Sequence, residues 1–184
     1  MQDVRDKIWF TYKARIQAHI RLSRADLHSQ LLLVWYALLS AALAIVAIRY
    51  PMVLGSDTDI LSALLGVLLL GVSMAVANRD FRGRGIAMRQ NYLSLQQLYS
   101  ETGLEPNSTT VAIKTYHDLL GQVENHRGID DKLFRVLHAA QLKNRRPSKI
   151  DRVLAYSYLV WHIFSLFFLY VFPLLAIAYF YERC

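Results

Sequence analysis

Three long apolar runs dominate the pattern of hydrophobic and polar positions along the chain. They cover residues 31–48, 60–77 and 153–181; the first two contain no charged side chain, and His162 is the only histidine within the third. An α-helix rises about 1.5 Å per residue, so the runs cover roughly 27, 27 and 43 Å, against a bilayer hydrocarbon core of about 30 Å. Each run therefore predicts a membrane-spanning helix, and the third must tilt or protrude.

Between these runs, apolar residues recur every three or four positions, which predicts amphipathic helices. One helix leads into the first run, a second follows the second run until Gly103 and Pro106, a third is capped within residues 106–110, and a short fourth begins at the aspartates of residues 130–131. No segment has the alternation of a strand. The recurring residues are, in chain order, Trp9, Tyr12, Ile16 and Ile20; Met88, Tyr92, Leu95 and Tyr99; Ile113, Tyr116, Leu120 and Val123; Leu133, Phe134 and Leu137.

The predicted fold class is an all-α membrane protein: a transmembrane helical hairpin, a third C-terminal transmembrane helix and a cytoplasmic helical region. We expect an N-terminal cytoplasmic amphipathic helix in residues 1–30, the hairpin in 31–77, the cytoplasmic region in 78–152 and the last span in 153–184. The cytoplasmic region is too short for a large core of its own. Its apolar seams are therefore expected to pack on each other and on other copies, which makes the protein a homo-oligomer.

Composition agrees with a membrane protein, and the distribution of charge predicts on which side of the membrane each loop lies. The chain is 54% hydrophobic, above the roughly 45–50% of soluble domains. Lys and Arg number six in residues 1–30, one in 49–59 and thirteen in 78–152. Because cytoplasmic loops retain positive charge, the N-terminus and the second loop are predicted to be cytoplasmic and the C-terminus external. The single cysteine, Cys184, excludes an intrachain disulfide framework.

The stretch VENHRGIDD, residues 123–131, places Asn, His and paired carboxylates close together. We interpret it as a corner between helices, to which Tyr116 also belongs: Asn125 or His126 ends one helix, Gly128 takes a left-handed conformation, and Asp130 or Asp131 caps the next helix. This interpretation makes the polar groups architectural.

Two alternatives for the corner are a metal site and a catalytic site. His117, His126 and Asp130 could supply metal ligands, but the diagnostic His or Cys spacings are absent. A catalytic role is not indicated, because the sequence contains neither a glycine-rich phosphate loop nor a recognisable setting for a nucleophile. We therefore expect no enzyme activity, no metal and no cofactor. His162 is interpreted as an interfacial residue beside Trp161, although an intramembrane histidine is also a functional candidate.

Small residues form one row on each helix of the hairpin, and such rows let helices approach closely. Two interpretations stay open: packing within one hairpin, or the lining of a pore when chains assemble. The candidate positions are Ala37, Ser40, Ala41 and Ala44 on the first helix and Ser62, Gly66, Gly71 and Ser73 on the second.

Basic residues cluster beside the predicted spans, where anionic lipid headgroups are their expected partners and nucleic acid is the alternative. A protein partner could use the same side chains. The candidates for lipid, partner or nucleic-acid contact are Arg15, Arg21, Arg79, Arg82, Arg84, Lys143, Arg145, Arg146 and Lys149.

Several blocks of sequence together resemble a known family. IWFTYKARIQAHIRLSRADLHS (8–29) precedes the hairpin, YLSLQQLY (92–99) and YHDLLGQVENHRGIDD (116–131) follow it, and a third apolar segment ends the chain. This arrangement resembles the SLATT proteins, the SMODS and SLOG-associating two-transmembrane effectors of bacterial conflict systems. The likeness is most specific at Arg15, Arg21, Leu22, Tyr116, Leu119, Asn125, His126 and Asp130.

The resemblance implies a membrane effector of antiphage defence in the bacterial inner membrane. Such an effector is expected to form a pore that permeabilises or depolarises the membrane when a partner signals infection. The Asn125–His126 pair and the extra C-terminal span are similar to those of the subgroup encoded beside reverse transcriptases. The implied partner is therefore a reverse transcriptase, its nucleic-acid product or an enzyme that makes a nucleotide signal. The alternative is a non-conducting anchor that recruits a cytoplasmic partner to the bilayer.

Overall fold

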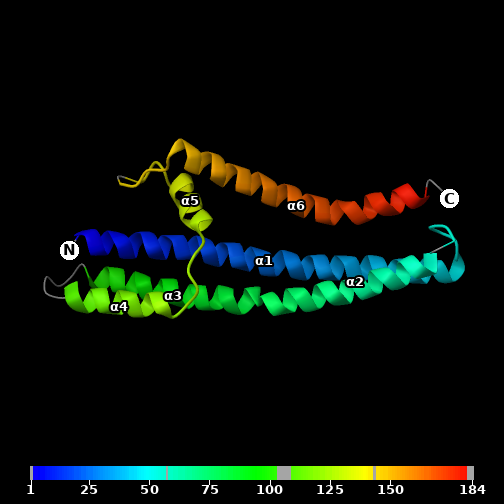
Figure 1. Ribbon diagram of the computed structural model, residues 1–184, viewed down its shortest axis with the longest axis horizontal. Coiled ribbons are helices and arrows are strands. Elements are labelled where there is room, and N and C mark those ends of the chain that lie inside the picture. Colours follow the sequence, from blue (N-terminus) through cyan, green and yellow to red (C-terminus); the bar gives the residue numbers. More distant parts are fainter. Residues whose placement is uncertain (1, 57, 103–108, 143, 182–184) are drawn as a thin grey trace. The chain divides into compact units, whose positions relative to one another are not determined.

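A computed structural model describes residues 2–56, 58–102, 109–142 and 144–181 (Figure 1). Within these residues the chain is helical and contains no strand, as the apolar periodicities predicted. The helices are α1 (Gln2–Arg49), α2 (Thr58–Arg79), α3 (Phe81–Glu101), α4 (Thr109–Gly121), α5 (Gly128–Leu137) and α6 (Lys149–Tyr181).

The helices divide into two compact units, which are described separately. The polar unit combines Met1–Arg24 with Phe81–Leu159, and the membrane unit combines Ala25–Asp80 with Val160–Cys184. Consequently α1 and α6 each contribute residues to both units. Asp80, whose φ of 42° lies in the left-handed region, separates α2 from α3.

Three helical stretches of the described chain are long and apolar enough to cross a membrane: Val4–Arg49, Thr58–Glu101 and Lys149–Tyr179. The most apolar window of each stretch is not buried inside the protein at all. Apolar side chains left exposed in this way need lipid or another copy around them. The prediction of three apolar helices, each long enough to span a bilayer, is thereby confirmed, and the chain is a membrane protein.

A short turn connects α1 and α2. Gly55 has a φ of 99°, a conformation that a glycine adopts without steric cost. The buried hydroxyl of Thr58 accepts the Leu54 N–H over 3.1 Å and donates to the Gly55 carbonyl over 2.7 Å. The first residue of α2 is thus fixed by its own side chain.

The core of the polar unit is organised around the first half of α1. Its largest cluster joins Ile8 and Tyr12 of α1 to Leu95 and Leu98 of α3 and to Ala112 and Leu119 of α4. Phe10 packs with Phe134 of α5 and with Leu142, and Ala18 and Leu22 pack with Met88 of α3. The apolar seams therefore do pack on each other, and the residues before the first span supply the central helix that residues 78–152 lack.

The end of α4 differs from the sequence prediction. The helix ends at Gly121, and not at Asn125 or His126. Gly128 is the first residue of α5 and does not adopt the left-handed conformation that was predicted for it. Gly121 and Gly128 are both glycines, the poorest helix formers after proline, so local sequence alone does not decide which of them ends α4. Gln122 to Arg127 thus form a non-helical connector. The predicted stops at Gly103 and Pro106 and most of the 106–110 cap lie outside the described residues.

Candidate functional site

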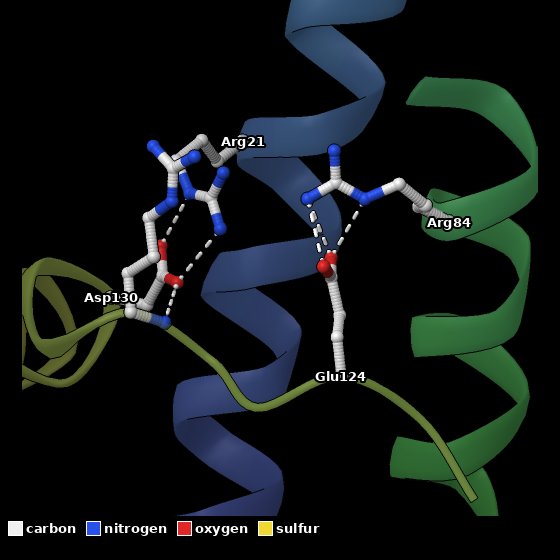
Figure 2. Close-up of polar contacts among 5 residues, drawn as sticks. Arg21, Arg84, Glu124 and Asp130 are labelled. Atoms are coloured by element: carbon white, nitrogen blue, oxygen red, sulfur yellow. Dashed lines mark hydrogen bonds and ion pairs between the residues drawn. The ribbon is translucent and has the colours of Figure 1, made fainter. Parts of the chain in front are cut away.

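A bidentate ion pair joins Arg21 of α1 to Asp130 of α5 (Figure 2). The guanidinium Nε and Nη2 donate to the two carboxylate oxygens over 2.8 and 3.1 Å. Asp130 is fully buried, and its Oδ2 also accepts the backbone N–H of Arg127 over 2.8 Å. Burial opposes the charge of Arg21, but the hydrogen bond and charge of Asp130 outweigh it and raise the pKa of the guanidinium. The pair therefore fixes the first turn of α5 on α1.

Arg15, two turns earlier on α1, holds the end of α4. It is only 1% exposed, and its Nη1 donates to the side-chain oxygen of Asn91 and, over 3.3 Å, to the carbonyl of Leu119. Nη2 donates to the carbonyl of Leu120 over 3.5 Å, and the Asn91 amide donates to Leu119 over 2.7 Å. These carbonyls belong to the last turn of α4, where helical donors are missing.

No carboxylate of the described residues pairs with Arg15. Its positive charge lies instead at the negative end of the α4 dipole, where the free carbonyls of Leu119 and Leu120 accept hydrogen bonds from the guanidinium group. Burial still lowers the pKa of Arg15, with a smaller opposing effect of Tyr116. Arg15 is thus a buried cap for α4, just as Asp130 is a buried cap for α5, and together they place the corner on α1.

A third contact holds the connector against α3. Arg84 donates three hydrogen bonds to the Glu124 carboxylate, over 3.0, 2.8 and 2.9 Å (Figure 2). The two side chains are 30% and 42% exposed, so water screens the pair. An exposed pair of this kind contributes about 0.2–1 kcal/mol.

The remaining predicted corner residues have different surroundings. Tyr116 of α4 shares a 2.9 Å hydrogen bond with the Thr11 hydroxyl of α1. The Asn125 side chain is exposed. His126 is half-buried, its Nδ1 is buried without a hydrogen-bond partner, and burial together with the charge of Arg15 lowers its pKa. In the part of the chain that the structure describes, no three His, Cys, Asp or Glu side chains gather where they could hold a metal ion.

The structure corrects the assignment of Arg15 and Arg21 as contacts to lipid, partner or nucleic acid. Both guanidinium groups are committed to intramolecular partners, Arg15 is buried, and the Arg21 side chain is 14% exposed. Arg84 is likewise engaged by Glu124. The side chains of Arg79, Arg82, Arg145, Arg146 and Lys149 are exposed, and Lys143 lies outside the described residues.

The small residues of the hairpin are mostly exposed in the single chain. Ser40 and Ser62 are half-buried, and the other six positions are exposed: Ala37, Ala41, Ala44, Gly66, Gly71 and Ser73. A Cβ added at Gly66 or Gly71 would meet no atom within 4 Å. Packing within one hairpin therefore does not explain these two glycines, and that interpretation is wrong for them.

One polar contact in the membrane unit was missed by the sequence analysis. The Tyr36 hydroxyl of α1 donates to the Leu169 carbonyl of α6 over 2.8 Å, and the Trp35 indole N–H donates to the Tyr170 carbonyl over 3.2 Å. Pro173 lies inside α6 and has no N–H for the carbonyl four residues earlier, which is that of Leu169. Pro173 could have indicated this contact in the sequence, because the Leu169 carbonyl that it leaves unpaired needs a hydrogen-bond donor from another helix.

The comparison with known families covers nearly the whole chain. The model for family 5 of the SMODS and SLOG-associating 2TM (SLATT) effector domains matches residues 1–180. The chain belongs to the SLATT family. No curated protein and no solved structure matches it. A SLATT protein with membrane-spanning helices is a membrane effector of bacterial conflict systems.

The residues that carried the resemblance to SLATT proteins lie together in the polar unit. Arg15 contacts Leu119, Arg21 pairs with Asp130, and Leu22 is buried in the core. The family description counts two transmembrane segments, whereas three described helices of this SLATT protein are long and apolar enough to span. Four of the most specific positions, Arg15, Arg21, Leu119 and Asp130, therefore serve the corner that joins α1, α4 and α5.

Proposed function

We propose that this SLATT protein is an effector of antiphage defence that assembles from several copies into a pore. The pore permeabilises or depolarises the inner membrane when a partner senses infection. It acts by assembly and not by catalysis. The distribution of Lys and Arg supports a cytoplasmic N-terminus and a cytoplasmic polar unit.

The observation that carries this proposal is the open space beside two exposed glycines of α2, Gly66 and Gly71, which lie five residues apart and therefore face directions about 140° apart around the helix. Glycine at positions 66 and 71 costs helix stability, and no atom of the described residues lies within 4 Å of a Cβ placed at either position. In membranes, small residues let the backbones of neighbouring helices approach closely. A helix from another copy would use that space, and several copies would be needed to enclose a water-filled path.

The partner is proposed from the resemblance. The description of the matched family names SMODS and SLOG as the associated modules. We propose a reverse transcriptase, or its nucleic-acid product, as the input for this chain. Purification of the protein with the reverse transcriptase of its defence system tests this directly: absence of both the enzyme and nucleic acid from the complex, before and during infection, would rule out that input.

Bulky substitutions in the spans test the pore. Gly71→Leu and Ala44→Trp should prevent depolarisation after the defence system is triggered, because the added volume blocks helix approach or the lumen. Val72→Leu is the matched control, since Val72 is a neighbouring exposed apolar residue of α2. Membrane potential in triggered cells is the measurement.

The alternative function is a membrane anchor that recruits a cytoplasmic partner without conducting. An anchor would protect cells fully with an unchanged membrane potential, and it would tolerate Gly71→Leu. That combination would refute the pore.

A further inference from the structure

A hollow of about 270 Å³ lies in the polar unit, where the segment after α5 meets the first turn of α6. Ala139, Ala140, Pro147 and the two arginines Arg146 and Arg152 line it. The wall thus combines small or rigid apolar residues with two guanidinium groups. Guanidinium groups present planar pairs of donors that match the oxygens of a phosphate.

Neither arginine is neutralised by a carboxylate of the described residues. The Nε of Arg146 donates to the Leu142 carbonyl over 3.1 Å, which holds the side chain and leaves the terminal nitrogens available. Asp151, beside Arg152 in the sequence, is engaged elsewhere: its Oδ2 accepts from the Ser148 hydroxyl over 2.9 Å and lies 3.8 Å from Arg135. The hollow therefore keeps a net positive charge.

The hollow lies beside the end of the longest apolar run. Arg152 is the last charged residue before residues 153–181, which extend about 43 Å as a helix. That length exceeds the hydrocarbon core but matches the roughly 40–45 Å of a bilayer that includes both headgroup layers. Arg152 is therefore expected at the level of the lipid phosphates.

The face of α6 that continues from Arg152 is apolar and exposed. Its residues are Tyr156, Val160, Ile163 and Phe167, which are 57%, 67%, 67% and 63% exposed. The spacings of four, eight, eleven and fifteen residues from Arg152 place them along one side of the helix. A molecule whose phosphate occupied the hollow could lay a hydrocarbon chain along this row.

We propose that the hollow between Arg146 and Arg152 binds the phosphate of an anionic phospholipid, with an acyl chain along the exposed row of α6. The site is narrower than the basic cluster that the sequence indicated: Arg145 is not part of it, since its guanidinium lies 4.8 Å from the Phe10 ring. The proposal requires a membrane location only and is independent of pore formation.

Native mass spectrometry of the full chain tests the site. The protein is delipidated in mild detergent and titrated with phosphatidylglycerol, and bound lipid per chain is counted. The Arg146→Gln/Arg152→Gln double variant should bind phosphatidylglycerol at least about tenfold more weakly, because it loses charge-assisted hydrogen bonds to the phosphate. Arg89→Gln removes an exposed charge of the same unit outside the hollow and should leave binding unchanged.

Parallel titrations identify the source of the phosphate. Phosphatidylcholine should bind more weakly than phosphatidylglycerol, and inorganic phosphate or a mononucleotide should not displace the lipid. Equal binding of phosphatidylglycerol by the double variant and by Arg89→Gln would overturn the site, and preferential binding of the soluble phosphate or nucleotide would overturn the lipid. If the Arg146→Gln/Arg152→Gln variant loses its helical circular dichroism, the Arg146→Lys/Arg152→Lys variant is tested in its place. That variant keeps both charges but has no guanidinium groups, so it should bind phosphatidylglycerol more weakly than the unaltered chain. Unchanged lipid binding would contradict recognition by the guanidinium groups.

Discussion

Removal of the Tyr36 hydroxyl should loosen α6 from α1 at Pro173. In most of a helix every carbonyl accepts the N–H four residues later, but Pro173 offers none to Leu169. The Tyr36 hydroxyl, 2.8 Å away, supplies the missing donor from α1. Inside a bilayer no water replaces it, so Tyr36→Phe leaves a carbonyl without a partner.

The size of the effect follows from interhelical hydrogen bonds in membranes, which contribute about 0.6–2 kcal/mol. We therefore expect Tyr36→Phe to lower the free energy of unfolding by an amount in that range. The assay is reversible unfolding in mixed micelles, followed by helical circular dichroism as the denaturing detergent increases. Tyr50→Phe is the matched control, because Tyr50 is 63% exposed in the turn after α1.

A double-mutant cycle with Pro173→Ala tests the physical reason. This substitution restores a backbone N–H to the Leu169 carbonyl, so the hydroxyl of Tyr36 becomes dispensable and Tyr36→Phe should then cost close to nothing. The expected coupling energy is about 0.5–2 kcal/mol. Equal costs of Tyr36→Phe in the unaltered chain and in the Pro173→Ala variant would show that the two residues are independent and would refute the reasoning.

Two further predictions concern the corner of the polar unit. Asp130→Asn leaves the largely buried Arg21 without its carboxylate and should lower the free energy of unfolding by about 3–5 kcal/mol. Asp131→Asn is the control: the pair of Asp131 with Arg135 is partly exposed, so its loss should lower the free energy of unfolding by under about 1 kcal/mol. Equal losses of the two variants in chemical denaturation would contradict this ranking. The pKa of His126 is lowered in the folded state, so the unfolded state binds more protons, and stability should be highest above about pH 6.5 and decrease as the pH falls through the folded pKa. His126→Gln should flatten that pH dependence in denaturation measured from about pH 8 to about pH 5, and an unchanged slope would exclude His126 as its source.

The sequence predicted what depends on local pattern. Each membrane helix is a run of apolar residues, and α1, α3 and α4 follow from apolar residues repeated at the helical period. The end of α4 was misplaced because Gly121 and Gly128 satisfy the same local rule. Which of the two glycines ends α4 depends on contacts between residues distant in sequence, such as the one between Arg84 and Glu124.

The site was harder to predict, because the groups that bind Arg15 and Arg21 are distant in sequence and some of them are backbone carbonyls. Arg15 and Arg21 were grouped with the basic residues beside the predicted spans, as candidates for contact with lipid, a partner or nucleic acid. Their acceptors are carbonyls at the end of α4 and a carboxylate of α5, more than a hundred positions away. No side-chain pattern indicates a free carbonyl at a helix end, and this is also why Tyr36 was missed despite the visible proline at position 173.

The unbroken course of α1 through both units has a consequence for variation in its length. Residues Gln2–Arg49 form one helix, which carries Arg21 in one unit and Tyr36 in the other. Each inserted residue turns everything beyond it by about 100° around the axis, so one or two insertions between these side chains would misalign them, whereas seven would return them to within about 20°. Changes of about seven or eleven residues in the middle of α1 would therefore keep Arg21 and Tyr36 at nearly their present angle around this helix, because they correspond to nearly whole numbers of helical turns.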